Sequence, residues 1–161
     1  MNPGRMEAEV VRDSLLAVAG KLDPKIGGQE LENSDALKTF RRSLYYSVFP
    51  EQGGKSSMGE LFDAPEPLEC YRRSRSIIPQ QALALTNSDL VHQLSTAIAA
   101  SITEPTAERF IIVTFERILS RQPTVNEIAT CLPFLTNPAD VRSRESLVRA
   151  ILNHNDFVTI R

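Results

Sequence analysis

Apolar residues recur at steps of three and four positions along much of this chain, and this spacing limits the fold to one built mainly from helices. The first stripe contains Met6, Val10, Val11, Leu15, Val18 and Leu22. It predicts a helix that ends near Gly20, since glycine is a common helix stop and a proline, Pro24, lies just beyond. The polar segment from Lys25 to about Leu37 contains turn-forming residues and is predicted to be a loop.

The second half of the chain carries the other helical stripes, which are separated by short polar connections. They predict helices over residues 79–85, 90–102, 107–118, 128–135 and 147–152. Pro79 suits the first turn of a helix, where its missing N–H group would have no partner. Thr124 and Glu127 have the spacing of a capping box, and Pro133 should kink or shorten the helix behind it. Short connections favour antiparallel packing of neighbouring helices.

Two segments have the composition of short strands. Residues 40–49 are rich in aromatic and apolar side chains and end at Pro50, and residues 157–160 form a second candidate. Two short strands need each other or a helix to be stable. Between the two segments, Met58–Phe62 is predicted as a helical turn. Asp63–Pro67 is predicted to be extended, because each proline disfavours helix in the residue before it.

These elements predict a mainly α-helical fold. We expect a single domain over residues 1–161 with five or six helices. A small two-stranded β element should join the middle of the chain to its C-terminus. The chain is long enough for one domain with a real core.

Composition narrows the functional classes. The net charge is −2 and the pI is about 5.7, so non-specific nucleic-acid binding is not expected. No apolar run reaches the roughly 18 residues of a membrane span. The two histidines and two cysteines lack metal-ligand or redox spacing, so we predict no metal site and no cofactor. A disulfide between Cys70 and Cys131 remains open, because spacing alone does not decide it.

Three arginines, Arg72, Arg73 and Arg75, fall within four positions. The guanidinium group is a rigid fork that suits carboxylates and phosphates. In one interpretation these arginines pair inside the fold with nearby carboxylates such as those of the 63–69 segment. In another they bind an acidic ligand or partner surface, with Ser76 and Gln80 sharing in either network. Specific nucleic-acid binding is a third interpretation, which the negative net charge disfavours.

Other catalytic patterns are weak. Gly53-Gly54-Lys55-Ser56 lacks the earlier glycine and the following helix of a phosphate-binding loop, so a surface loop accounts for it better. His92 is one turn beyond Ser88, but Ser88 is better explained as a helix cap. His154 falls at a predicted helix exit. No two carboxylates of the 63–69 segment are required by the sequence to face each other.

The segment Cys70–Asn87, which contains these three arginines, also carries a family resemblance. Its residues Cys70, Arg73, Ser76, Pro79, Gln80, Ala82, Leu83 and Asn87 resemble the pattern C-x-x-R-x-x-S-x-x-P-x-Q-A-L-x-x-x-N. This pattern is typical of the planctomycete PSD domain, domain of unknown function 1553. Further resemblance covers residues 2–13, 41–45, 62–65, 119–127 and 152–157. Ser120 stands where the family usually has Gly, and Asp156 stands where it usually has Glu.

The resemblance implies a C-terminal module of a longer exported bacterial protein, in the periplasm or cell envelope. Its implied partners are the other domains of that parent, among them a cytochrome-c-like domain. The start at Asn2-Pro3-Gly4 also suggests a fragment. The haem-attachment motif Cys-x-x-Cys-His is absent here, so covalent haem is not expected in this chain. The family offers no established catalytic residue to transfer.

Two functional hypotheses follow. In the first, the chain is a non-catalytic binding or interaction domain for a partner domain or an acidic ligand such as a polysaccharide. Its candidate ligand-binding residues are Arg72, Arg73, Arg75, Ser76 and Gln80. In the second, it is a hydrolase or lyase domain with a site between the Asp63–Glu69 loop and the same arginines. An enzyme would need a pocket with a titratable group of perturbed pKa, whereas a module needs only an exposed patch or groove.

Overall fold

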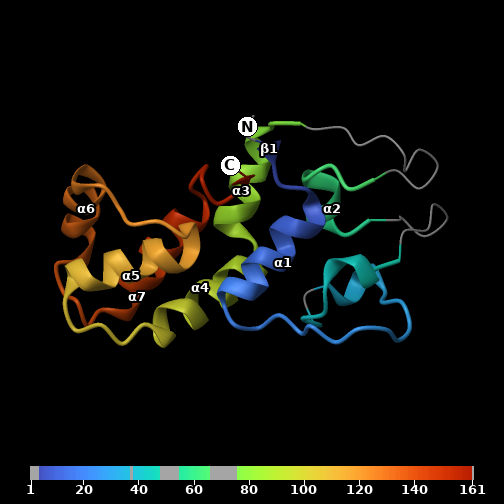
Figure 1. Ribbon diagram of the computed structural model, residues 1–161, viewed down its shortest axis with the longest axis horizontal. Coiled ribbons are helices and arrows are strands. Elements are labelled where there is room, and N and C mark those ends of the chain that lie inside the picture. Colours follow the sequence, from blue (N-terminus) through green and yellow to red (C-terminus); the bar gives the residue numbers. More distant parts are fainter. Residues whose placement is uncertain (1–3, 37, 48–54, 66–75, 161) are drawn as a thin grey trace. The chain divides into compact units, whose positions relative to one another are not determined.

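A computed structural model describes residues 4–36, 38–47, 55–65 and 76–160. Over these residues the fold is mainly helical, with seven α-helices and a two-stranded antiparallel sheet (Figure 1). This confirms the predicted fold class. The chain divides into two compact units, one of residues 1–84 with 159–161 and one of residues 85–158. That the whole chain forms a single domain stays a prediction.

In the first unit, α1 (Ala8–Val18) is the helix that the first apolar stripe predicts. Its inward face is fully buried at Val11, Leu15 and Leu16. Gly20 follows it with φ +67°, a conformation that costs glycine little because it has no Cβ. The predicted turn near Met58 is α2 (Ser57–Leu61), which packs on α1 and is capped by Ser56. No helix in the described ranges is long and apolar enough to cross a membrane.

The sheet differs from the prediction in its partners. Strand β1 (Gly4–Arg5) pairs with β2 (Thr159–Ile160), so the sheet joins the two ends of the chain. Residues 40–47 were predicted as a strand, and that prediction is wrong. They form the short 3-10 helix η2 (Ser43–Tyr45) and two isolated bridges, one to Asp23 and one to Leu31. Residues 48 and 49 lie outside the described residues.

The buried side chain of Arg12 supplies hydrogen-bond donors to the irregular segment that ends in η2. Its two Nη atoms donate hydrogen bonds of 2.8–2.9 Å to the backbone carbonyls of Ala36, Thr39 and Arg41, and one of 3.1 Å to the hydroxyl of Tyr46. Burial from water lowers the pKa of Arg12 from its ordinary value. Buried carbonyl groups must find donors, and one guanidinium supplies them to three residues here. Arg12 therefore holds this irregular segment against α1.

Helix α3 (Pro79–Asn87) begins at the predicted proline, and Ser88 then caps α4 (Asp89–Ser101). Three further helices complete the second unit: α5 (Ala107–Leu119), α6 (Val125–Cys131) and α7 (Val141–Leu152). Helix α7 packs on both α4 and α5. Pro133 shortens α6 as predicted, because the chain continues from Cys131 as the 3-10 helix η4 (Leu132–Leu135).

The core of the second unit consists of the predicted apolar stripes. Its most deeply buried members include Leu94, Ile98, Phe110, Ile111, Phe115, Val148 and Leu152. Unpaired backbone N–H groups at the starts of these helices find acceptors in nearby side chains. The acceptors are Ser88, Thr106, Thr124 and Asp140. A cap of this kind contributes about 1 kcal/mol. Local capping and burial of one face thus account for this unit.

Candidate functional site

Three of the five predicted ligand-binding residues, Arg72, Arg73 and Arg75, fall in 66–75 and lie outside the described residues. The other two, Ser76 and Gln80, follow that segment and are described. Ser76 is partly buried and Gln80 is exposed in the first turn of α3. The site is therefore built from the residues that border the arginine segment.

Asp63 and Ser76 bind each other across the base of this segment. The Ser76 hydroxyl donates to the Asp63 carboxylate at 2.9 and 3.0 Å, and the Ser76 backbone N–H donates to Asp63 Oδ2 at 2.5 Å. These bonds join positions 13 residues apart. The Asp63–Ser76 clamp therefore holds Asp63 and Ser76 next to each other.

Asp63 is not extended, which corrects the prediction for Asp63–Pro67 at its first residue. Its φ is +57°, in the left-handed region. Aspartate is one of the few residues with a side chain that tolerates this region. The turn is closed by a hydrogen bond of 2.8 Å from the Ala64 N–H to the Gly59 carbonyl. The backbone therefore turns at Asp63.

Gln81 is the residue at this base that sequence reasoning missed. It is 1% exposed, and its Nε2 atom donates to the carbonyls of Leu61, at 2.7 Å, and Ser76, at 3.2 Å. Its Oε1 atom is buried and has no hydrogen-bond partner among the described residues. The signal that could have found it is helical spacing: Gln81 lies four positions before the buried Leu85, so the two share a face of α3.

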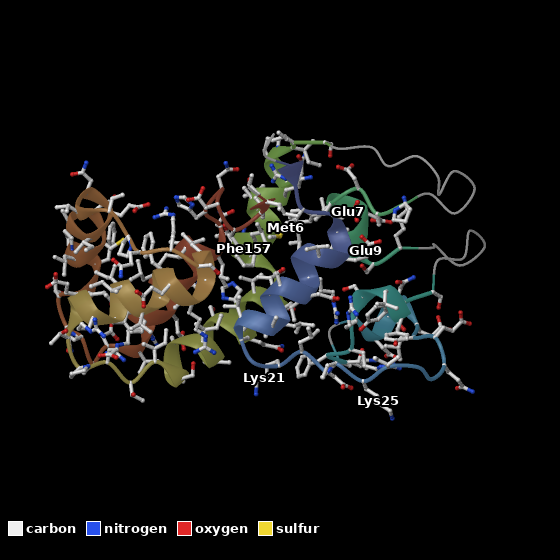
Figure 2. All side chains as sticks on the ribbon, in the orientation of Figure 1. Met6, Glu7, Glu9, Lys21, Lys25 and Phe157 are labelled. Carbon is white, nitrogen blue, oxygen red and sulfur yellow. The ribbon has the colours of Figure 1, made fainter. Side chains whose placement is uncertain are left out.

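A small cavity with mixed polar and apolar lining lies beside this base in the first unit. Its lining includes Arg12 and Glu9 of α1, Lys55, and Ala64 and Pro65 at the start of the arginine segment. Glu9, which is labelled in Figure 2, stands at the start of α1. The cavity volume is about 50 Å³, enough for a few water molecules and too small for an organic ligand. A larger ligand would have to bind outside it.

A second polar cluster, the Arg121 cluster, lies in the second unit and comprises Arg121, Glu127, His154 and Asp156. Arg121 binds the Glu127 carboxylate through two nitrogens, at 2.7 and 3.0 Å, and donates from Nε to Asp156 at 2.9 Å. The same Glu127 carboxylate accepts the N–H and the hydroxyl of Thr124 at the predicted capping box. The cluster therefore ties α6 to the segment that follows α7.

The contacts within the Arg121 cluster favour the charged forms of Arg121 and Glu127. The hydrogen bonds that Arg121 donates lower the pKa of Glu127 from 4.5 to about 2, and the same bonds raise the pKa of Arg121. His154 Nδ1 accepts the Asp156 backbone N–H at 3.0 Å, and its Nε2 is 4.0 Å from the Glu127 carboxylate. A general base needs to reach a substrate proton. Here the carboxylates accept from Arg121, so the cluster is arranged for stability.

Two of the remaining candidate residues, His92 and Ser88, have structural partners. His92 is exposed, and its Nδ1 atom lies 2.5 Å from Nη1 of Arg149. Ser88 accepts the Val91 N–H as the cap of α4, which is the role predicted for it. Cys131 is a half-buried free thiol, and burial raises its pKa. Within the described part of the chain, no three His, Cys, Asp or Glu residues lie close enough together to hold a metal ion.

Comparison with known proteins gives one match. The model of the family described as "Protein of unknown function (DUF1553)" matches residues 1–135. The match takes in the Asp63–Ser76 clamp and the arginine segment, and it ends at the last residue of η4. No curated protein and no solved structure matches the chain.

Proposed function

We propose, from the premise that the chain belongs to the DUF1553 family, that it is a non-catalytic binding module. Its ligand would be an acidic surface: a partner domain or an acidic polysaccharide. Arg72, Arg73 and Arg75 would make the ionic contacts, and Gln80 would add an amide at the exposed start of α3. Ser76 would act through Asp63 by holding the segment in place.

The observation that carries this proposal is the Asp63–Ser76 clamp. A segment that is anchored at both ends loses less conformational entropy on binding than a free one does. The clamp uses both carboxylate oxygens of Asp63 and the N–H and hydroxyl of Ser76. Gln81 reinforces it by binding the Ser76 carbonyl from inside the unit. Binding residues often lie beside positions that a rigid scaffold holds in place, which supports this proposal.

The ligand should be acidic and should bind through several contacts. Guanidinium groups pair with carboxylates in a bidentate manner, and three of them in four positions match a repeating array of acids. Binding of this kind weakens as salt screens the charges. The family resemblance extends the proposal to an exported, multidomain parent, in which another domain such as a cytochrome-c-like one would be the natural partner.

The test is a binding measurement with polygalacturonate as the acidic polysaccharide and dextran as the neutral control. Wild type should bind polygalacturonate in a salt-sensitive manner and leave dextran unbound. Arg73→Ala should weaken binding about tenfold or more, the loss expected for a charge-assisted hydrogen bond. The matched control is Arg109→Ala, because Arg109 is an exposed arginine of α5 in the other unit.

Three outcomes would contradict the proposal. The wild-type chain could fail to bind both polygalacturonate and the parent's other domains. Alternatively, Arg73→Ala and Arg109→Ala could weaken binding equally. Arg73→Ala could also lose its cooperative melting, which would make the arginines part of the architecture. Ser76→Ala adds a separate readout, since loss of the clamp should weaken binding without removing a guanidinium.

The hydrolase or lyase alternative stays a prediction. It needs a free acid or base beside the arginines, and the described carboxylate of this region, that of Asp63, is bound by Ser76. New reducing ends or unsaturated products from polygalacturonate in the same assay would favour it.

A further inference from the structure

The second unit holds a groove that is separate from the Arg121 cluster. Residues of α6, η4 and α7 line it. Its volume is about 520 Å³, within the roughly 300–1,000 Å³ that small-molecule sites usually have. Phe134, Leu147 and Ala150 supply apolar lining. The groove therefore has the size and the surface of a ligand site.

Phe134 is the most unusual residue of the groove. Its side chain is 68% exposed, although full burial of a phenylalanine contributes roughly 1.5–3 kcal/mol. Pro133 precedes it and turns the chain from α6 into η4, so the backbone itself holds Phe134 at the rim. Leu147, by contrast, is 5% exposed and forms part of the groove's inner surface. An apolar group in the groove would contact both residues.

The charge of the groove lining indicates which kind of apolar ligand fits it. Of the described residues that line the groove, Arg142 is the one with a full charge. Its acidic neighbour Asp140 is engaged at the start of α7, where it accepts the N–H groups of Arg142 and Ser143 and the Ser143 hydroxyl. No ion pair within the described ranges joins the Arg142 guanidinium to a carboxylate, although hydrogen bonds from Ser143 and, to a smaller extent, the charge of Arg142 lower the pKa of Asp140. The groove thus offers a cation beside an apolar surface.

A second polar group is available nearby. Ser146, one turn after Arg142 on α7, also lines the groove. Its oxygen accepts a hydrogen bond of 3.2 Å from Arg149 Nη2, so its hydroxyl proton can be donated to a ligand. A carboxylate has two oxygens with about four lone pairs. One carboxylate can therefore accept from both Arg142 and Ser146 while an attached apolar chain follows Phe134 and Leu147.

We propose that this groove binds a small amphipathic anion, a molecule with one carboxylate and a single apolar chain. Arg142 and Ser146 hold the carboxylate, and Phe134, Leu147 and Ala150 cover the chain. This ligand differs from the acidic surface proposed for the arginine segment, and its site lies in the other unit. A negative result for one site would therefore not count against the proposal for the other.

The test uses three probes with the same eight-carbon chain and different head groups: octanoate, octanol and octylammonium. Backbone amide shifts of the wild-type chain are followed by NMR as each probe is added. Octanoate should bind saturably, with the largest shifts in residues 130–150. Octanol and octylammonium should bind at least about tenfold more weakly than octanoate, because each lacks the charge-assisted bond to Arg142.

Two variants separate the head from the tail. Arg142→Gln should reduce octanoate affinity about tenfold and leave octanol unchanged, whereas Phe134→Ser should weaken both. Arg109→Gln, an exposed arginine on α5 outside the groove, is the matched control and should bind as wild type does. Phe134 and Arg142 are both exposed, so both variants are expected to fold.

Several results would overturn the proposal. Equal binding of all three probes would make the groove a non-selective apolar surface. Shifts centred outside residues 130–150 would place octanoate elsewhere. A concentration-dependent dimer that buries the same residues and excludes octanoate would show that a second copy of the chain covers the groove.

Discussion

Replacing Glu127 with glutamine isolates the charge of the Arg121 cluster. Glutamine has the same shape as glutamate, and its single carbonyl oxygen can still accept the Thr124 N–H of the capping box. It cannot accept two bonds from Arg121, because its NH₂ group is a donor that would face the guanidinium. The variant therefore keeps the helix cap and loses the bidentate pair, whose bonds measure 2.7 and 3.0 Å.

The expected size follows from the pKa of Glu127. The hydrogen bonds from Arg121, with smaller contributions from those of Thr124, lower that pKa from 4.5 to about 2, and one pKa unit corresponds to about 1.4 kcal/mol. The difference in pKa would correspond to roughly 3–4 kcal/mol. The two side chains keep 26% and 28% of their surface exposed, so water screens the pair and a smaller value is expected. We predict that Glu127→Gln lowers the free energy of unfolding by about 1–2 kcal/mol near neutral pH.

The pH dependence provides the sharper test. The folded-state pKa of Glu127 is depressed, so the carboxylate contributes its full stability above about 4.5 and loses it as the pH falls toward about 2. Below that pH Glu127 is protonated in both states, and wild type and variant should become equally stable. The difference between them should therefore shrink across this window alone.

The assay is urea denaturation followed by far-ultraviolet circular dichroism at a series of pH values. Amide hydrogen exchange in α5 and α6 assigns the change to the second unit. The matched control is Glu108→Gln, because Glu108 lies in the first turn of α5 as Glu127 lies in that of α6. It tests the helix-terminus charge without the Arg121 pair. A Glu127→Gln loss no larger than that of Glu108→Gln, or a loss that persists unchanged at pH 2, would refute the reasoning.

Two further predictions concern single residues with unusual positions. Arg12→Met should lower the free energy of unfolding of the first unit by about 3 kcal/mol or more, because three backbone carbonyls lose their donor; chemical denaturation checks this, and a loss below 1 kcal/mol would mean that water replaces the guanidinium. Ser120→Gly should raise stability by about 0.5–1 kcal/mol, since Ser120 ends α5 with φ +53°, which glycine adopts without strain. Thermal unfolding checks it, and a lower Tm than wild type would contradict it.

Local signals in the sequence were sufficient for the helices. The apolar spacing placed α1, α4, α5 and α7, and the cap at Ser88 and the capping box at Thr124 marked where helices begin. Pro133 was expected to shorten α6, and it does so. These features depend on residues within one or two turns of each other, so they can be read from neighbouring letters.

Partners far apart in the sequence were not accessible in the same way. The C-terminal strand was expected to pair with residues 40–49, whereas Thr159–Ile160 pairs with Gly4–Arg5. The composition of residues 40–49 favours a strand, but in the described part of this segment the Arg41 carbonyl accepts from the guanidinium of Arg12. The carbonyls of Phe40 and Tyr45 accept from the backbone N–H groups of Asp23 and Leu31. Tertiary hydrogen bonds therefore overrode local propensity, as they often do in strands.

The candidate site shows the same division. The arginine segment was visible from its composition, and Ser76 was included with it. The clamp to Asp63, the buried amide of Gln81 and the pairing of Arg121 with Asp156 were not predicted, because each joins residues 5 to 35 positions apart. The left-handed turn at Asp63 was also missed, since the nearby prolines predicted an extended chain.

The sequence alone determined which segments are helical, where most of them start and stop, and which faces they bury, because short-range hydrogen bonding and apolar periodicity set these features. The tertiary structure alone decided what the polar side chains do. Arg12, Gln81 and Arg121 gain their roles from carbonyls and carboxylates that packing brings within hydrogen-bonding distance, because most buried donors pair with whichever acceptor the fold places beside them.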